Sequence, residues 1–225
     1  MRTIKPLPAK GKLIKLIEAA GSGSTAHFGY PELKDGLFLQ QDPEEFASFV
    51  HFVASELPPA ALSLDLGTAS GGQTKFLRDY YSCDKTIVLD IGLHPNFVEW
   101  ARIKPQVNSD IILEIIDDSH SPKVATQLAP FTGQIDFAYV DGDHSYRGLK
   151  KDIFLVRELL RLGGYLVLHD TLAVPECKRV YDELLSSPYF VLIRNFDYRF
   201  GISIWQKKGG RKSSPINRRF GIGKI

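Results

Sequence analysis

Between Leu62 and Leu168 the sequence alternates regularly between short apolar runs and longer amphipathic segments. This alternation restricts the fold more than any other feature of the chain. The apolar runs have the length of buried strands, and they lie at 62–66, 86–90, 111–116, 135–140 and 165–168. Strands that alternate with helices are joined by right-handed crossovers into a parallel, doubly wound sheet. We therefore predict an α/β fold with helices on both faces of the sheet.

A helix start precedes the first of these strands. Asp42 is in the N-cap position, Pro43 follows at the first helical position, and Glu45 lies three residues after the cap. Gly163 and Gly164 are expected to end a later helix that begins at Tyr146. The further predicted helices begin at Gln73 or span 95–102, 121–128, 146–161 and 175–186.

The chain ends with two more predicted strands, 190–194 and 200–206. Only residues 195–199 separate them, which is too short for a crossover between parallel strands. The sequence therefore predicts an antiparallel hairpin at the end of a mainly parallel sheet.

A turn of small residues follows the first strand, and it consists of Gly67, Thr68, Ala69, Ser70, Gly71 and Gly72. Its glycines let the backbone approach a ligand closely, and the N–H groups of the next helix point into the gap. The turn therefore predicts a nucleotide site. A dinucleotide fingerprint would have glycine where Ala69 stands, which argues against nicotinamide.

Acidic residues and histidines follow the ends of the predicted strands, where ligands bind in a doubly wound sheet. Asp141 and Asp170 end neighbouring βαβ units and should lie close together. Their charges repel unless a cation, a proton or a histidine lies between them. His144 is the candidate general base, because imidazole titrates near neutrality. The alternative is a helix-cap histidine that donates to Asp141 or Asp143.

Two motifs resemble one known family. DLGTASGG, from Asp65 to Gly72, is similar to motif I of class I S-adenosylmethionine (SAM) methyltransferases. DGDHSY at 141–146, with HD at 169–170, resembles a branch that acts on hydroxyls of sugars and secondary metabolites and is related to catechol-type, metal-dependent enzymes. The resemblance covers about residues 36–207. It implies a seven-stranded sheet of order 3-2-1-4-5-7-6 whose last strand is antiparallel.

The resemblance also implies roles for individual residues. Asp65 and the turn 67–72 would lie near the methionine end of SAM, Asp90 would accept from the ribose hydroxyls, and Asp118 with Ser119 would contact adenine. Asp141 would serve both cofactor and catalysis, beside His144. The related metal-dependent enzymes hold Mg²⁺ at this place, which implies a metal site at Asp141, His169 and Asp170. The His-Asp pair departs from the oxygen donors that Mg²⁺ prefers, which leaves Mn²⁺, a softer metal or a metal-free histidine base open.

Charge is distributed unevenly along the chain. The whole chain carries +2, yet residues 207–225 hold seven bases and no acid, so the rest is net acidic. An acidic body favours a small-molecule or glycan acceptor over nucleic acid. We expect an N-terminal extension or lid at 1–36, a SAM-binding domain at 37–207 and a basic tail at 208–225.

Several broader expectations follow. No run reaches the ~18 apolar residues of a membrane span, and we expect a cytoplasmic enzyme that could form homo-oligomers. SAM-dependent O-methylation is the leading interpretation. The alternatives are an oxidoreductase or hydroxylase on a similar sheet, and a non-catalytic binding module that acts through the basic tail.

Overall fold

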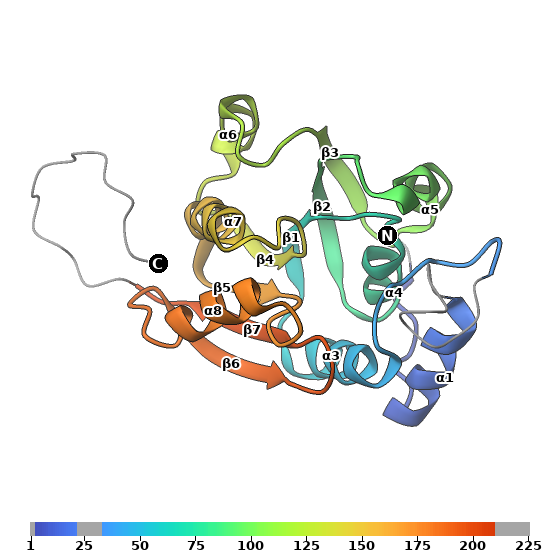
Figure 1. Ribbon diagram of the computed structural model, residues 1–225. Helices are drawn as coiled ribbons and strands as arrows, with labels where there is room; N and C mark the ends of the chain where they lie inside the picture. The colour runs from blue at the N-terminus through green and yellow to red at the C-terminus, as the bar shows by residue number, and fades with distance from the viewer. Residues whose placement is uncertain (1–2, 22–32, 210–225) are drawn as a thin grey trace, which may run out of the picture.

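A computed structural model describes residues 3–21 and 33–209 of the 225-residue chain. Seven strands form one sheet in the order β3-β2-β1-β4-β5-β7-β6 (Figure 1). Strand β7 is antiparallel to both of its neighbours, and the remaining pairs are parallel. The predicted order and the closing antiparallel hairpin are therefore confirmed. The strands are β1 (Ala60–Leu66), β2 (Cys83–Asp90), β3 (Asp110–Ile116), β4 (Ile135–Val140), β5 (Leu160–Leu168), β6 (Phe190–Phe196) and β7 (Ile202–Lys207).

Helices cover both faces of the sheet (Figure 1). One apolar cluster packs α6 (Pro122–Leu128), α7 (Tyr146–Leu159) and α8 (Pro175–Leu184) on one face. Two further clusters lie on the other face, with α1 (Lys10–Ala20), α3 (Pro43–Glu56), α4 (Gly72–Tyr80) and the short α5 (Trp100–Ile103). Central strand β4 serves both faces, because Ala138 and Val140 belong to one cluster and Phe137 and Tyr139 to another. This alternation is expected for a strand buried on both sides.

The start of α3 matches its sequence signature. The side chain of Asp42 accepts hydrogen bonds from the backbone N–H groups of Glu44 and Glu45, each at 3.0 Å, and Pro43 opens the helix. This N-cap fixes the direction in which the chain enters the helix. The residues just before it, 38–41, form one wall of the site described below.

Two predicted boundaries were wrong. Helix α7 ends at Leu159, and Leu160 already pairs with Ile135 in the sheet, so the strand begins five residues earlier than predicted. Gly163 and Gly164 lie inside β5, where the register shifts and Gly163 has a φ of +77°. The two glycines therefore form an irregularity in a strand and do not end a helix.

The predicted helix 95–102 is also broken into shorter pieces. A 3₁₀ turn, Pro95–Glu99, leads into α5, and a second one, Lys104–Gln106, follows it; a third, Ala129–Phe131, follows α6. Nδ1 of His94 accepts from the N–H of Asn96 at 3.1 Å and so caps the first turn. Pro105 lacks the N–H that a continuing α-helix would need.

The two ends of the chain are described only in part. Leu13 and Ile17 of α1 are fully buried against the apolar cluster that includes α3. Residues 22–32, part of the predicted extension or lid, and 210–225, most of the predicted basic tail, lie outside the described residues. In the described part of the chain, each helix is too short or too polar to cross a bilayer.

Candidate functional site

A cavity of about 570 Å³ opens at the carboxyl ends of β1, β2, β4 and β5. In a doubly wound sheet this edge is where ligands bind. Three further segments complete the wall: residues 38–41 before α3, the loop after β3, and the loop between β6 and β7. Most of the residues that the sequence singles out line it, namely Gly67, Thr68, Ala69, Ser70, Asp90, Asp118, Ser119, Asp141, His144, His169 and Asp170.

The small-residue turn is held close to the neighbouring strand end. Gly67 has a φ of +81°, and a Cβ atom there would overlap the backbone carbonyl of Asp141. Only glycine combines this conformation with so close an approach. Ser70 Oγ donates to the carbonyl of Leu37 at 2.8 Å, which ties the turn to the wall before α3. Gly71 and Gly72 do not line the cavity; the Cα of Gly71 packs on the Trp100 ring.

One side chain of the turn and one at the start of α4 have buried polar atoms without a partner in the described part of the chain. Thr68 Oγ1 and Gln73 Nε2 are buried without a hydrogen-bond partner among the described residues, and both side chains line the cavity. Buried polar groups in folded proteins are nearly always paired. Two unpaired groups in the wall of one cavity therefore indicate the position of a polar ligand.

Asp90 braces the turn from the end of β2. Its Oδ2 accepts from the N–H of Ala69 at 2.8 Å, and its Oδ1 accepts from the N–H of Gly92 at 2.6 Å. Ala69 has a φ of +46°, so this bond holds an unusual backbone conformation. Each carboxylate oxygen keeps a second lone pair for a ligand in the cavity.

Asp65 lies behind the turn and is absent from the cavity wall. Arg78 of α4 donates to its two oxygens at 3.0 and 3.2 Å, and both side chains are buried. The pair links β1 to α4 beneath the turn. The structure thus pairs Asp65 with Arg78 outside the cavity wall, and its implied place near the cofactor stays a prediction.

The loop after β3 is fixed by a residue that the sequence did not single out. Asp152 of α7 is fully buried and accepts from Ser119 Oγ at 2.6 Å, and His120 Nε2 lies 3.1 Å from the same oxygen. Burial raises the pKa of Asp152, and this effect outweighs the hydrogen bond from Ser119 and the charge of His120, which both lower it. Asp118 is mostly exposed and accepts from the N–H of His120 at 2.9 Å. Asp152 lies three residues after Leu149 and four before Val156, so the helical spacing places it on the apolar face of α7 and could have identified it as a buried acid.

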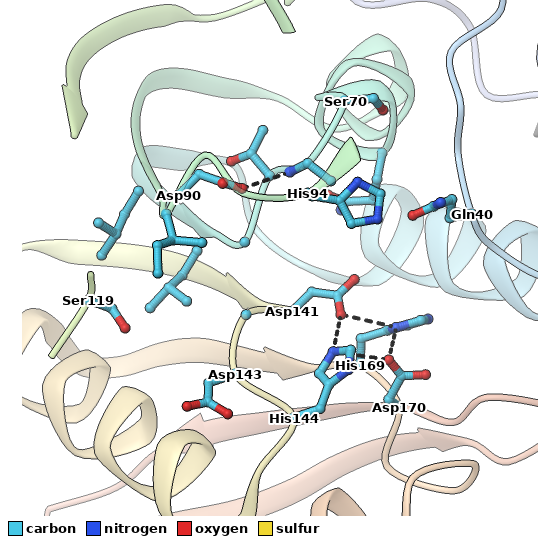
Figure 2. A pocket seen from close by; sticks show the side chains of 18 of the residues that line it. Gln40, Ser70, Asp90, His94, Ser119, Asp141, Asp143, His144, His169 and Asp170 are labelled. Carbon is cyan, nitrogen blue, oxygen red and sulfur yellow. Dashed lines mark hydrogen bonds and ion pairs between the residues drawn. The ribbon is translucent and has the colours of Figure 1, made fainter. Parts of the chain in front are cut away.

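Two carboxylates and two imidazoles meet where β4 and β5 end (Figure 2). Nε2 of His144 lies 3.1 Å from Asp141 Oδ1 and 3.2 Å from Asp170 Oδ2. Nδ1 of His169 lies 3.4 Å from Asp141 and 3.2 Å from Asp170. We call these four residues the Asp/His cluster. The sequence predicted that Asp141 and Asp170 would approach each other, and the structure brings them to the same histidine nitrogens.

Mutual charge governs the protonation of the cluster. Burial alone would raise the pKa of Asp141, but the charge of His169 and the hydrogen bond with His144 outweigh it and lower the pKa. The pKa of His144 is raised, chiefly by its hydrogen bond with Asp141. Burial opposes charge on His169, yet Asp141 and Asp170 raise its pKa as well. A positive charge between the two carboxylates is therefore strongly favoured.

The same cluster has the geometry of a cation site. Asp141, His144 and Asp170 each offer one ligand atom, and these atoms lie within 4.8 Å of one another. The predicted metal set contained His169 in place of His144. His169 is 6% exposed, and its Nε2 has no hydrogen-bond partner among the described residues. Asp170 has a φ of +58°, a strained conformation that is common at functional sites.

Figure 2 shows that the labelled side chains gather at two ends of the cavity. Asp90 and Ser119 lie toward one end, and the Asp/His cluster lies toward the other, with His94 and Gln40 beside the space between them. His94, Gln40, Gln73, Phe38 and Phe200 line the cavity but were not predicted as site residues. The His-Pro pair at 94–95, a helix-start signal directly after a strand end, could have pointed to His94.

The chain is similar in sequence to known methyltransferases. Residues 64–171 match the family model described as "Methyltransferase domain". Rhamnosyl O-methyltransferases of Mycobacterium bovis and Mycobacterium tuberculosis are 31% identical over 127 residues, which are 53% of this chain and 49% of each relative. The chain thus matches about half the length of these curated relatives.

Solved structures agree at the level of fold. The O-methyltransferase TomG from Streptomyces achromogenes, in complex with SAM, has a TM-score of 0.52, 15% identity, and coverage of 92% of both chains. The N-methyltransferase NodS from Bradyrhizobium japonicum, in complex with S-adenosylhomocysteine (SAH), has a TM-score of 0.52, 13% identity, and covers 89% of this chain and 99% of its own. An rRNA methylase from Streptococcus thermophilus has a TM-score of 0.53, 14% identity, and covers 73% and 97%. Residues 64–171 thus match a methyltransferase domain, and the chain has the class I methyltransferase fold.

Proposed function

We propose that this protein, whose residues 64–171 match a methyltransferase domain, transfers the methyl group of SAM to a hydroxyl of a small molecule or glycan. The observation that carries the proposal is one continuous cavity. It joins the turn 67–70 and Asp90, which suit a nucleoside, to the Asp/His cluster, which suits deprotonation of a hydroxyl. Rhamnosyl O-methyltransferase, the name of the relatives with 31% identity, favours a sugar hydroxyl as the acceptor.

SAM would lie along the turn. In this proposal the ribose hydroxyls donate to the free lone pairs of Asp90, and Asp118 with Ser119 contacts adenine. Thr68 Oγ1 and Gln73 Nε2, which lack partners among the described residues, would bind polar groups of the cofactor or acceptor. Asp65 would support the turn from behind through its ion pair with Arg78.

We further propose that the Asp/His cluster binds a divalent cation. Asp141, Asp170 and His144 supply two carboxylates and an imidazole, with His169 beside them. Imidazole ligands suit Mn²⁺ or a softer metal better than Mg²⁺, which prefers an all-oxygen shell. When bound, such a cation lowers the pKa of an acceptor hydroxyl.

The chain's own residues could also remove the proton without a metal. An ionised carboxylate only accepts hydrogen bonds, so Nε2 of His144 would donate to Asp141, and Nδ1 of the neutral imidazole would then receive the acceptor's proton. In this mode His169, whose Nδ1 lies between the same two carboxylates, carries the positive charge. The hydroxyl oxygen forms a bond to the methyl carbon as the carbon–sulfur bond breaks, which yields SAH. His144 Nε2 cannot donate to Asp141 and bind a metal at once, so the two modes are alternatives. In both, alignment and exclusion of water supply much of the rate.

Methyl transfer from tritiated SAM to a panel of sugars, glycosides and phenols tests the proposal. We expect label in at least one hydroxyl-bearing acceptor, with SAH as the second product. Transfer confined to RNA, or to nitrogen acceptors, would contradict the proposed acceptor class. Repeating the reaction after chelation, and then with Mn²⁺ or Mg²⁺, separates the two modes.

A further inference from the structure

Glu45 has an unusual set of partners for an acidic residue in the first turn of a helix. Its side chain is buried and accepts hydrogen bonds from four consecutive backbone N–H groups in the loop between β6 and β7. Oε1 accepts from Tyr198 at 3.1 Å, from Arg199 at 3.2 Å and from Gly201 at 2.9 Å, and Oε2 accepts from Phe200 at 3.1 Å. We call residues 197–201 the clamped loop.

The clamped loop in turn holds the segment that follows Asp170. The N–H of Thr171 donates to the carbonyl of Gly201 at 3.2 Å. The N–H groups of Leu172 and Ala173 both donate to the carbonyl of Phe200, at 2.8 and 3.0 Å. Backbone hydrogen bonds thus run from Glu45 through the loop to the residues directly after Asp170.

Both ends of this network reach the acceptor end of the cavity. Phe200 lines the cavity, and its ring lies 6.1 Å from that of His169. Asp170 keeps its left-handed backbone only while neighbouring contacts hold it, because this conformation is unfavourable for an aspartate. The Asp90 side of the cavity has no part in these bonds.

Helix capping does not account for Glu45. Asp42 already caps the first turn of α3 through the N–H groups of Glu44 and Glu45. The clamped loop points four backbone N–H donors at Glu45, and an ionised carboxylate is the side chain that accepts without donating. A glutamine would turn an NH₂ group toward one or more of these N–H groups.

We propose that Glu45 is a positioning residue that sets the acceptor end of the site, acting through the clamped loop on Asp170 and Phe200. This inference rests on the proposed function, since it names what the loop positions. It does not make Glu45 a group that touches substrate or cofactor. Its effects should therefore appear at the Asp/His cluster and be absent from the cofactor turn.

Amide hydrogen exchange tests this on the full chain, with Glu45→Gln compared to Glu44→Gln. Glu44 is the matched control, because it is half exposed and its charged partner is the surface residue Lys10, at 3.5 Å. We expect Glu45→Gln to speed exchange about 10- to 100-fold at residues 198–201 and also at 171–173, with β1 and β4 unchanged. Affinity for SAH, measured by calorimetry, should stay within about threefold. The Glu44 variant should match the wild type.

Two outcomes would overturn the proposal. In the first, only 198–201 exchange faster, so the loop does not hold the Asp170 segment. In the second, exchange rises equally in β1 and β4, so Glu45 contributes only to overall stability. If Glu45→Gln fails to fold, Glu45→Asp keeps the charge on a shorter side chain, and the same comparison of 171–173 with β1 and β4 applies.

A kinetic comparison adds a readout of function. With an acceptor from the methyl-transfer screen, Glu45→Gln should lower kcat more than tenfold and leave the KM for SAM unchanged. Unchanged kcat would overturn the positioning role. A wild type that transfers no methyl group would count against the proposed function alone, because the exchange result does not depend on turnover.

Discussion

Nε2 of His144 lies 3.1 Å from Oδ1 of Asp141. The carboxylate at the end of β4 thus orients the imidazole that directly precedes the N-cap of α7. If His144 takes the acceptor's proton or binds a cation, His144→Ala should lower methyl transfer about 10²- to 10⁴-fold. Calorimetric affinity for SAH should stay nearly unchanged. His51→Ala, on α3 and outside the cavity wall, is the control. Full activity in His144→Ala would refute both roles.

The close approach of the turn to the end of β4 can be tested at Gly67, with Gly133 as the control position. Both have positive φ values, +81° and +69°, but a Cβ at Gly133 would meet nothing within 4 Å. Gly133→Ala should cost about 1–2 kcal/mol, the penalty for left-handed backbone. Gly67→Ala should cost about 1–3 kcal/mol more, because the methyl group overlaps the Asp141 carbonyl. Urea denaturation measures both, and equal losses would show that the turn tolerates the extra atom.

Removing one partner of the buried ion pair Arg78–Asp65 should strongly lower the free energy of unfolding. Arg78→Leu leaves the Asp65 carboxylate buried without its cation, which typically costs about 3–5 kcal/mol. Removing both charges in Arg78→Leu/Asp65→Asn should recover part of that loss. Lys178→Ala, which breaks an exposed pair with Asp182, should cost at most about 1 kcal/mol. If Arg78→Leu lost as little stability as Lys178→Ala, the Asp65 carboxylate would be stabilised by other groups than Arg78.

Asp152 gives the clearest pH dependence outside the Asp/His cluster. Burial raises the pKa of Asp152 in the folded state, so its contribution to stability is present below the ordinary pKa of aspartate and is lost as pH rises through the folded pKa. Ser119, His120 and Asp143 are the polar and charged groups that act on it. Asp152→Asn cannot ionise and can still accept from Ser119. The variant should therefore gain stability relative to the wild type as the pH rises above the ordinary pKa of aspartate, about 4.

Denaturant melts at a series of pH values above that pKa are the measurement. A constant stability difference between the two proteins would show that the pKa of Asp152 is the same folded and unfolded.

The sequence predicted most of the fold because its signals are local. Strand-length apolar runs, the Asp42 cap and the short 195–199 connection each concern neighbouring residues, and each corresponds to an observed element. The α7–β5 boundary was missed because two glycines usually end a helix, whereas Leu160 was drawn into the sheet by pairing with the distant Ile135.

The site was predictable to the extent that topology alone assembles it. Asp141 and Asp170 meet because parallel strands end at one edge. The partners of Asp65, Asp152 and Glu45 could not be predicted, since each is set by tertiary packing with residues 13, 33 and more than 150 positions away.

Thermal unfolding with SAH, and in parallel with NAD, tests the central claim that the cavity binds the methyl donor. SAH at a hundred times its dissociation constant should add about 2.7 kcal/mol. For a domain of this size that corresponds to roughly 5–10 °C in Tm. We predict such a shift with SAH, none with NAD, and a loss of the SAH shift in Asp90→Ala. No shift with millimolar SAH, or an equal shift with NAD, would contradict the account.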